Sequence, residues 1–176
     1  MPPKRQTASF LRNRFDEVGI HPKSRHGQNF LIDLNLIDVL VRAADLGPKD
    51  VVLEVGTGTG ALTGMMAAKA AQVVSVELDP QLHQLASEEL FSCENVTLLL
   101  QDALRNKNNI ADSVIEAVQA KIATVDGARF KLAANLPYNI ATPLISNLLL
   151  TPITPVQMTV TIQTVSYTHL TLPTKA

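Results

Sequence analysis

The sequence predicts an α/β domain built on an open, mostly parallel β-sheet with helices on both faces. Two features of the 176-residue chain predict this fold class. Short apolar runs alternate with longer segments whose apolar residues recur at helical spacing, which is the pattern of repeated βαβ units. The runs are apolar throughout, as in strands that helices cover on both faces. A hydrophobic content of 46% provides one sizeable core, so we expect a single domain.

The elements are expected in a regular order along the chain. A short helix over residues 7–18 precedes a second helix that starts after the N-cap candidate Asp33 and ends near Gly47. Pro143 lies in the first turn of the last helix, where proline is tolerated. Ligands of such sheets bind at the carboxyl ends of the strands, beside the point where the strand order reverses. The remaining strands are expected at 51–55, 73–76, 96–100, 130–134 and 156–162, and the remaining helices at 61–71, 80–90, 112–125 and 142–150.

Charge and cysteine content restrict the classes of function. The formal charge is −1, but residues 1–26 carry six basic and two acidic side chains, so a basic leader of charge +4 precedes an acidic remainder. On charge alone, a solvated leader is a simpler interpretation than RNA binding. The lone Cys93 and four scattered histidines give no disulfide and no zinc spacing, so we expect no metal. No segment is typical of a membrane span or a secretory signal, and we expect a cytoplasmic protein without membrane contact.

The strongest local signal is a glycine-rich turn between the first predicted strand and the following helix, Glu54-Val-Gly-Thr-Gly-Thr-Gly60. Glycines at Gly56 and Gly58 permit positive φ and let a ligand approach the main chain, while the helix start offers free N–H groups. Glu77 lies 21 residues beyond Gly56, where an acid would meet ribose hydroxyl groups. The same string fits the dinucleotide fingerprint, so a nicotinamide-dependent oxidoreductase stays open.

Two further signals follow the third and fourth predicted strands. Asp102 comes directly after the third strand, where its carboxylate can accept a hydrogen bond from an adenine amino group or simply cap a helix. The string Asn135-Leu136-Pro137-Tyr138 comes directly after the fourth strand. Because the carboxyl ends of parallel strands meet at one edge of the sheet, both signals are expected beside the glycine-rich turn.

The 135–138 segment suits methylation of an exocyclic amine better than hydride transfer. The amine of adenine is a poor nucleophile because its lone pair is delocalised into the ring, so a site must provide acceptors for both N–H groups. The side-chain carbonyl of Asn135 and a main-chain carbonyl near Leu136 can accept them, and Pro137 stiffens the segment. Tyr138 can stack on an extruded base, a contact worth about 1 to 3 kcal/mol. A purely structural turn is a common use of these residues singly, but not of all four together.

Five motifs occur in the order found in one enzyme family. They are Gly27-Gln-Asn29-Phe-Leu31, Glu54-Val-Gly-Thr-Gly-Thr-Gly60, Val76-Glu-Leu-Asp79, Gln101-Asp-Ala103 and Asn135-Leu-Pro-Tyr-Asn-Ile140. Over about residues 8–163 the chain closely resembles the ribosomal RNA adenine N6,N6-dimethyltransferases, and the bacterial small-subunit branch is the most similar. The resemblance implies a Rossmann-like, S-adenosylmethionine-dependent methyltransferase fold.

The resemblance also implies a role for each motif. Asn29 and Leu31 would close over S-adenosylmethionine, and Gly56 would lie under its methionine part. Glu77 would hold the ribose hydroxyls and Asp102 the adenine amino group, while Glu54 would support the glycine turn through hydrogen bonds. The implied cofactor-binding residues are Asn29, Leu31, Gly56, Gly58, Glu77, Asp102 and Asn135, and the implied catalytic residues are Asn135, Leu136, Pro137 and Tyr138.

The implied reaction is transfer of methyl groups from S-adenosylmethionine to the N6 amines of two adjacent adenosines in 16S ribosomal RNA. Direct in-line displacement needs proximity and orientation rather than a catalytic triad or a metal. We expect a monomer that acts on the precursor of the small subunit. Alternatives are a large-subunit RNA methyltransferase that confers antibiotic resistance, a nicotinamide-dependent oxidoreductase, and a non-catalytic RNA-binding factor.

The chain departs from the family pattern after Gln163. The pattern continues with a charged helix, two more strands and a small helical C-terminal domain, whereas residues 164–176 resemble none of these. We therefore expect residues 1–163 to form an incomplete methyltransferase domain that lacks the C-terminal strands and helical domain. Residues 164–176 are interpreted as an artefactual, non-family tail without function. We expect the last strand to form an unpaired, apolar sheet edge.

Overall fold

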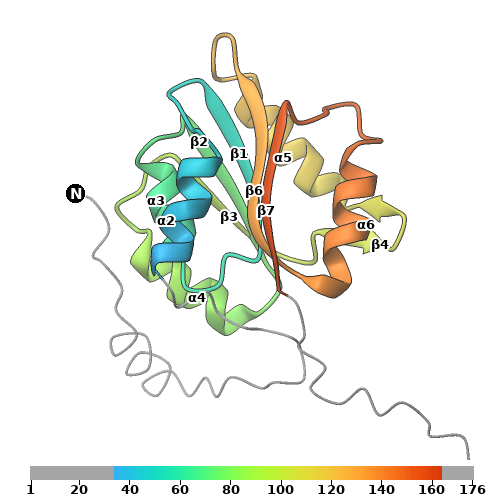
Figure 1. Cartoon of the computed structure of the whole chain (residues 1–176), viewed down its shortest axis with the longest axis horizontal. Coiled ribbons are helices and arrows are strands. Elements are labelled where there is room, and N and C mark those ends of the chain that lie inside the picture. The colour runs from blue at the N-terminus through green and yellow to red at the C-terminus, as the bar shows by residue number, and fades with distance from the viewer. Residues whose placement is uncertain (1–33, 164–176) are drawn as a thin grey trace, which may run out of the picture.

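The structure is a computed structural model that describes residues 34–163, and its centre is a parallel sheet (Figure 1). The sheet has five strands in the order β3-β2-β1-β6-β7, and each neighbouring pair is parallel. The predicted α/β class with a parallel sheet is therefore confirmed. The strands are β1 (Asp50–Val55), β2 (Gln72–Glu77), β3 (Val96–Leu100), β6 (Arg129–Pro137) and β7 (Gln157–Gln163).

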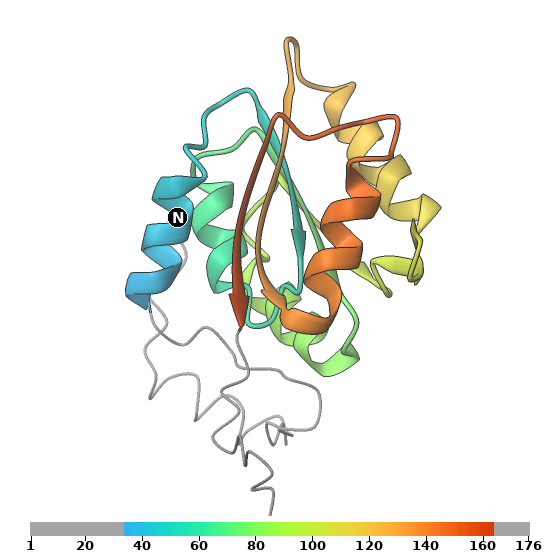
Figure 2. The same ribbon diagram turned by 45° about the vertical axis from the view of Figure 1, so that its right-hand side comes forward.

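Helices cover both faces of the sheet (Figure 2). On one face α2 and α3 pack on a core cluster that includes Ile37, Met66 and Ala133. On the other face α5 and α6 pack on a larger cluster that includes Leu53, Val118 and Leu136. Alternate residues of a strand point to opposite faces, so the all-apolar runs of the sequence are explained by burial on both sides. The helices are α2 (Leu34–Ala43), α3 (Ala61–Ala67), α4 (Pro80–Glu89), α5 (Asp112–Ile122) and α6 (Tyr138–Leu148).

The strand order reverses between β1 and β6. From β1 the chain proceeds to β2 and β3 on one side, and it then returns to the other side of β1 with β6 and β7. Helices that leave the carboxyl ends of β1 and β6 must therefore diverge, which opens a crevice between them. Both the glycine-rich turn and the 135–138 segment lie at this end of the sheet.

Three predicted helices end three or four residues earlier than expected, and the helices expected to reach residues 90 and 150 end at Glu89 and Leu148. The helix expected to run to about Gly47 ends at Ala43, because Asp45 has a positive φ of 45° and breaks the helical path. The helix expected to reach residue 71 ends at Ala67, where the side-chain amide of Asn95 donates to the carbonyl of Ala67 and to that of Ala70 just beyond the helix. The helix expected to reach residue 125 ends at Ile122, ahead of Gly127 with φ of 66°.

The boundary between the fourth predicted strand and the last helix was also placed wrongly. β6 extends to Pro137 rather than ending at residue 134, because its pairing with β7 continues to Gln163. The helix then begins at Tyr138 rather than Thr142, so Pro143 lies inside α6 and not in its first turn. The sequence reading also missed a small antiparallel hairpin, β4 (Leu104–Asn106) and β5 (Asn109–Ile110).

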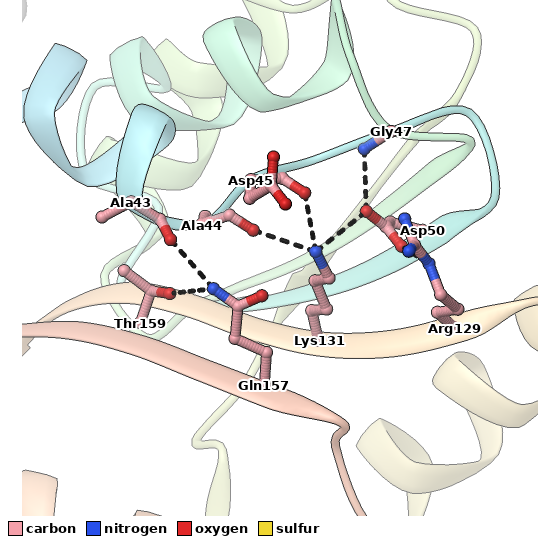
Figure 3. A network of polar contacts seen from close by, with 9 residues as sticks. All are labelled: Ala43, Ala44, Asp45, Gly47, Asp50, Arg129, Lys131, Gln157 and Thr159. Carbon is pink, nitrogen blue, oxygen red and sulfur yellow. Dashed lines mark hydrogen bonds and ion pairs between the residues drawn. The ribbon is translucent and has the colours of Figure 1, made fainter.

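A buried charge network ties α2 to the amino ends of β1, β6 and β7 (Figure 3). The ammonium group of Lys131 donates to the carbonyls of Ala44 and Asp45 at 3.0 and 2.7 Å and lies 3.2 Å from the carboxylate of Asp50. Arg129 donates to the same carboxylate at 2.7 Å. Gln157 of β7 donates to the carbonyl of Ala43. The end of α2 is thus capped by side chains of the sheet, at the edge opposite the crevice.

Several predictions concern residues outside the described range. They are the basic leader 1–26, the helix over 7–18, the N-cap Asp33, the cofactor-closing residues Asn29 and Leu31, and the non-family tail 164–176. Within the described range β7 is an edge strand, as expected. Its edge is not wholly apolar, because Gln157, Thr159 and Thr161 share the face that α2 covers.

Replacing Lys131 with methionine should lower the free energy of unfolding by about 3 kcal/mol, measured by urea denaturation. The substitution keeps the length of the side chain but leaves Asp50 and two carbonyls without their buried ammonium partner. The matched control is Arg129→Met, whose side chain is 51% exposed and should cost about 1 kcal/mol or less. An equal loss in the two variants would contradict the assignment of Lys131 as the buried anchor.

Candidate active site

A pocket of about 380 Å³ opens at the carboxyl ends of β1, β2, β3 and β6. Its walls come from the glycine-rich turn, the ends of these strands and the first turn of α6. The pocket therefore lies where the reversal of strand order predicts a ligand site. The predicted site residues among its lining are Gly56, Gly58, Glu77, Asp102, Asn135 and Pro137.

The glycine-rich turn adopts the backbone conformation for which glycine is needed. Gly56, Gly58 and Gly60 have φ of 86°, 57° and 79°. A Cβ at Gly56 would lie only 3.9 Å from the main-chain oxygen of Asn135, so the two chain segments approach closely across the crevice. A Cβ at Gly60 would lie 3.1 Å from Leu90 Cδ1, which fixes the start of α3 against α4. The first two glycines thus expose main chain to the pocket, and the third serves packing.

Glu77 is held in place by main-chain donors. Its Oε2 accepts from the N–H of Gly58 at 2.8 Å, and its Oε1 accepts from the N–H groups of Leu78 and Asp79 at 2.9 and 3.0 Å. The side chain is only 5% exposed, yet it lines the pocket. A carboxylate has about four lone-pair positions, so these three bonds orient the group and leave limited further acceptor capacity. The contact also joins the end of β2 to the glycine-rich turn.

Glu54 lies beneath the turn and is fully buried. Thr63 and Ser75 donate hydrogen bonds to its Oε2 at 2.5 and 2.7 Å, while Oε1 has no partner among the described residues. Burial raises the pKa of Glu54 to about 8, and the charge of Glu77 adds to this effect although the two hydrogen bonds oppose it. The two donors lie on α3 and β2, and the link from Glu54 to the turn runs through the Ser75 hydroxyl, which is hydrogen-bonded to the Thr57 hydroxyl at 2.5 Å. A direct support of the turn by Glu54 stays a prediction.

The end of β3 presents two polar side chains to the pocket. Asp102 is exposed, and its Oδ1 accepts from the N–H of Leu104 at 2.8 Å, which closes a local turn. The structural role considered for Asp102 is thus partly observed, but at a turn before β4 rather than at a helix cap. Gln101 accepts from Ser113 through Oε1, and its buried Nε2 has no partner among the described residues. This amide was not identified as a site residue from the sequence.

The 135–138 segment is divided between the pocket and its surroundings. Asn135 lines the pocket, and its Oδ1 accepts from the hydroxyl of Thr161 at 2.7 Å. The side chain of Leu136 is fully buried in the apolar core, so only its main chain can serve a ligand. Tyr138 is 68% exposed and does not line the pocket, and it begins α6. An exposed ring at the rim can meet a base that is presented from outside.

Sequence reasoning missed three residues around this segment. Asn139 lines the pocket one residue beyond Tyr138, and Gln101 precedes Asp102 in the wall. Asn139 and Gln101 both belong to motifs quoted above, so their position in these motifs was enough to identify them as candidate site residues. Thr161 lies on β7, and only the pairing register brings it beside Asn135.

No helix in residues 34–163 is both long and apolar enough to cross a membrane. In the same part of the chain, histidine, cysteine and acidic side chains form no group of three or more that could hold a metal ion.

Replacing Glu54 with glutamine should remove a pH dependence of stability. Because the pKa of Glu54 is about 8 in the folded chain and near 4.5 when unfolded, its stabilising protonation is complete below pH 4.5 and is lost as the pH rises toward 8. Urea denaturation of both proteins from pH 5 to 8 should show the wild type losing up to about 1.4 kcal/mol per pH unit relative to Glu54→Gln. A constant difference across this range would mean that Glu54 is ionised throughout.

Sequence comparison identifies one protein family that this chain matches. A family model described as ribosomal RNA adenine dimethylase matches residues 20–174. Relatives named ribosomal RNA small subunit methyltransferase A include the protein of Pelotomaculum thermopropionicum, 43% identical over 133 residues, and that of Moorella thermoacetica, 38% identical over 134 residues. These matches cover 75% and 76% of this chain but only 44% and 45% of the relatives. The chain thus spans less than half the length of the curated relatives that it matches.

Solved structures give the same fold. The 23S rRNA methyltransferase ErmE is 28% identical with a TM-score of 0.55, over 75% of this chain and 45% of that one. A dimethyladenosine transferase from Plasmodium falciparum is 23% identical with a TM-score of 0.54, over 70% and 39% of the two chains, and shows the fold alone. The predicted Rossmann-like methyltransferase fold is confirmed. With a family model that matches most of its length, the chain belongs to the ribosomal RNA adenine dimethylase family.

Proposed function

We propose that this chain binds S-adenosylmethionine and belongs to an enzyme that methylates the N6 amines of two adjacent adenosines in 16S ribosomal RNA. The observation that carries the proposal is the convergence of Gly56, Glu77, Asp102 and Asn135 on one pocket at the strand-order reversal. The names of relatives that are 38% and 43% identical support the small-subunit RNA as the substrate.

The chemistry of the pocket suits this cofactor. Main chain at Gly56 and Gly58 lines the pocket without a side chain, so the amino-acid part of the cofactor can approach the glycine-rich turn closely. The oriented carboxylate of Glu77 can accept from ribose hydroxyls, and Asp102 Oδ2 can accept from an adenine amine. Apolar side chains such as Ile37, Leu78 and Leu82 complete the wall around a nucleoside. When bound, S-adenosylmethionine supplies a methyl group activated by its sulfonium.

Asn135 is proposed to hold the target amine. Asn135 lines the pocket, and its Oδ1 is proposed to accept one N–H of adenine while a nearby main-chain carbonyl accepts the other. These acceptors favour a pyramidal nitrogen whose lone pair points at the methyl carbon, and the acceleration comes from this alignment. Tyr138 lies at the rim, where stacking would keep an extruded base in place. The proton of the amine leaves to water after transfer.

A second methylation requires space for the first methyl group beside Asn135. Gly56, which has no side chain, approaches the main-chain oxygen of Asn135 across the crevice. Thr161, whose side chain is small, contacts Asn135 from the neighbouring strand. This arrangement supports dimethylation in a single pocket, because no bulky group of these neighbours blocks a monomethylated amine.

The alternatives have weaker support. The large-subunit enzyme ErmE is 28% identical, below the small-subunit relatives over a similar share of this chain. Hydride transfer by a nicotinamide-dependent oxidoreductase does not require an amide such as that of Asn135 in the pocket. A non-catalytic RNA-binding factor does not require the pocket. We propose further that the chain acts as a monomer on the precursor of the small subunit in the cytoplasm. One chain provides every described wall of the pocket, and the bacterial relatives are named for ribosomal RNA.

Calorimetric titration should show binding of S-adenosylmethionine by the wild-type chain and no binding of NADH. Replacing Glu77 with glutamine should weaken S-adenosylmethionine binding about tenfold or more, because a charged acceptor for ribose hydroxyls is lost. Glu116→Gln is the matched control, since Glu116 is exposed on α5 away from the pocket. Binding of NADH alone would support the oxidoreductase and overturn the proposal.

Replacing Asn135 with alanine should lower methyl transfer to 16S ribosomal RNA by about a hundredfold or more, because an oriented acceptor for the target amine is removed. The measurement is single-turnover transfer of labelled methyl groups, followed by mass spectrometry of the nucleosides. Asn108→Ala is the matched control in an exposed loop. Wild-type chain that makes only monomethyladenosine would contradict the proposed dimethylation, and an unchanged rate in Asn135→Ala would remove Asn135 from the mechanism.

A further inference from the structure

The hydrogen bond between the side chains of Thr161 and Asn135 bears on the proposed reaction. It lies opposite Asn135 in the parallel pairing of β6 with β7, so the two side chains are on the same face of the sheet. The Thr161 hydroxyl donates to Asn135 Oδ1 at 2.7 Å, a short bond in a half-buried position. Thr161 does not line the pocket, whereas Asn135 does. The threonine therefore reaches the pocket only through the asparagine.

The contact ties the side chain of Asn135 to β7. The final torsion of an asparagine side chain is broad and nearly two-fold, so an amide without a partner can present either oxygen or nitrogen to a ligand. A hydroxyl can donate to the amide oxygen or accept from the amide nitrogen, and in the structure the Thr161 hydroxyl donates to Oδ1. In this arrangement Thr161 occupies one lone-pair position of Oδ1, and the second position can accept a substrate N–H.

The backbone of β7 does not require this hydroxyl. Pairing of β6 with β7 runs through main-chain bonds from Lys131 opposite Gln157 to Pro137 opposite Gln163. Valine has the same shape as threonine and a high preference for strands, so a change at Thr161 can remove the hydroxyl and keep the strand. Thr159 is a close match on the same face, two residues earlier, and its hydroxyl contacts Gln157 rather than Asn135. A substitution at Thr159 is therefore a matched control for the same substitution at Thr161.

We propose that Thr161 is a positioning residue for methyl transfer, which holds the Asn135 amide so that Oδ1 accepts an N–H of the target amine. This inference rests on the proposed function, because it assigns Asn135 to the amine. The threonine acts on orientation and not on cofactor affinity, since it lies outside the pocket wall. It also extends the functional site to β7, an element that no predicted motif includes.

Single-turnover methyl transfer distinguishes a positioning role from a structural one. Thr161→Val should lower the rate about tenfold, while the affinity for S-adenosylmethionine and the unfolding midpoint stay near those of the wild type. Thr161→Ser restores the hydroxyl and should recover most of the rate. Thr159→Val should leave the rate unchanged. A wild-type rate in Thr161→Val, or an equal loss in Thr159→Val, would overturn the proposal.

A second measurement does not depend on transfer. In ¹⁵N-labelled chain, the NMR resonance of the Asn135 side-chain amide is identified by its absence in Asn135→Asp. In Thr161→Val this resonance should change position and the amide should become more mobile. In Thr161→Ser both properties should be those of the wild type. An unchanged resonance would overturn the proposal, because Thr161 would not orient Asn135. If the wild-type chain binds S-adenosylmethionine but transfers no methyl group, the proposed function fails, and the resonance alone decides whether Thr161 holds the amide.

Discussion

Parallel pairing of β1 with β6 brings together two strands that are far apart in the sequence, and it creates the crevice on which the candidate site depends. The chain leaves β1 through the glycine-rich turn toward one face and leaves β6 through Pro137 toward the other. Gly56 and Asn135 consequently face each other across a short gap. Neither segment forms a pocket alone, because one provides exposed main chain and the other provides an amide acceptor. The function of both segments therefore follows from the strand order.

The carboxylates beneath and beside the glycine turn act on it differently. Glu77 accepts hydrogen bonds from the main-chain N–H groups of Gly58 and Leu78, and it also lines the pocket. Glu54 is fully buried, and burial raises its pKa to about 8 against two hydrogen bonds from hydroxyl groups. Glu54 is thus a neutral acid buried under the turn, whereas Glu77 is an oriented carboxylate that can contact a ligand in the pocket. This division explains how the two acids can lie near each other, because only one of them carries a charge at neutral pH.

Local patterns in the sequence were sufficient for the five strands of the parallel sheet, the helices beside it and the place of the pocket, because apolar periodicity and strand-end motifs report burial directly. Gly56, Glu77, Asp102 and Asn135 could be located from their position after strands. Element boundaries could not be located, since helix ends depend on distant side chains such as Lys131 and Asn95, which bond carbonyls at or just beyond the end of a helix. Thr161 was missed for a related reason, because its contact with Asn135 depends on a pairing register that no local motif records. The burial of Gln101 Nε2, which has no partner among the described residues, likewise cannot be read from the motif that contains it.

The register of β6 is constrained by charge as well as by shape. Lys131, Ala133 and Asn135 alternate along the face that α2 and α3 cover, while Leu132 and Leu136 enter the opposite core. A slip by one residue would exchange the two faces, moving Asn135 away from the pocket and the Lys131 ammonium into an apolar cluster. Burying an unpaired ammonium there is far more costly than misplacing a neutral amide. The charge network at the amino ends of the strands thus fixes the position of Asn135 near their carboxyl ends, although the two lie at opposite ends of the sheet.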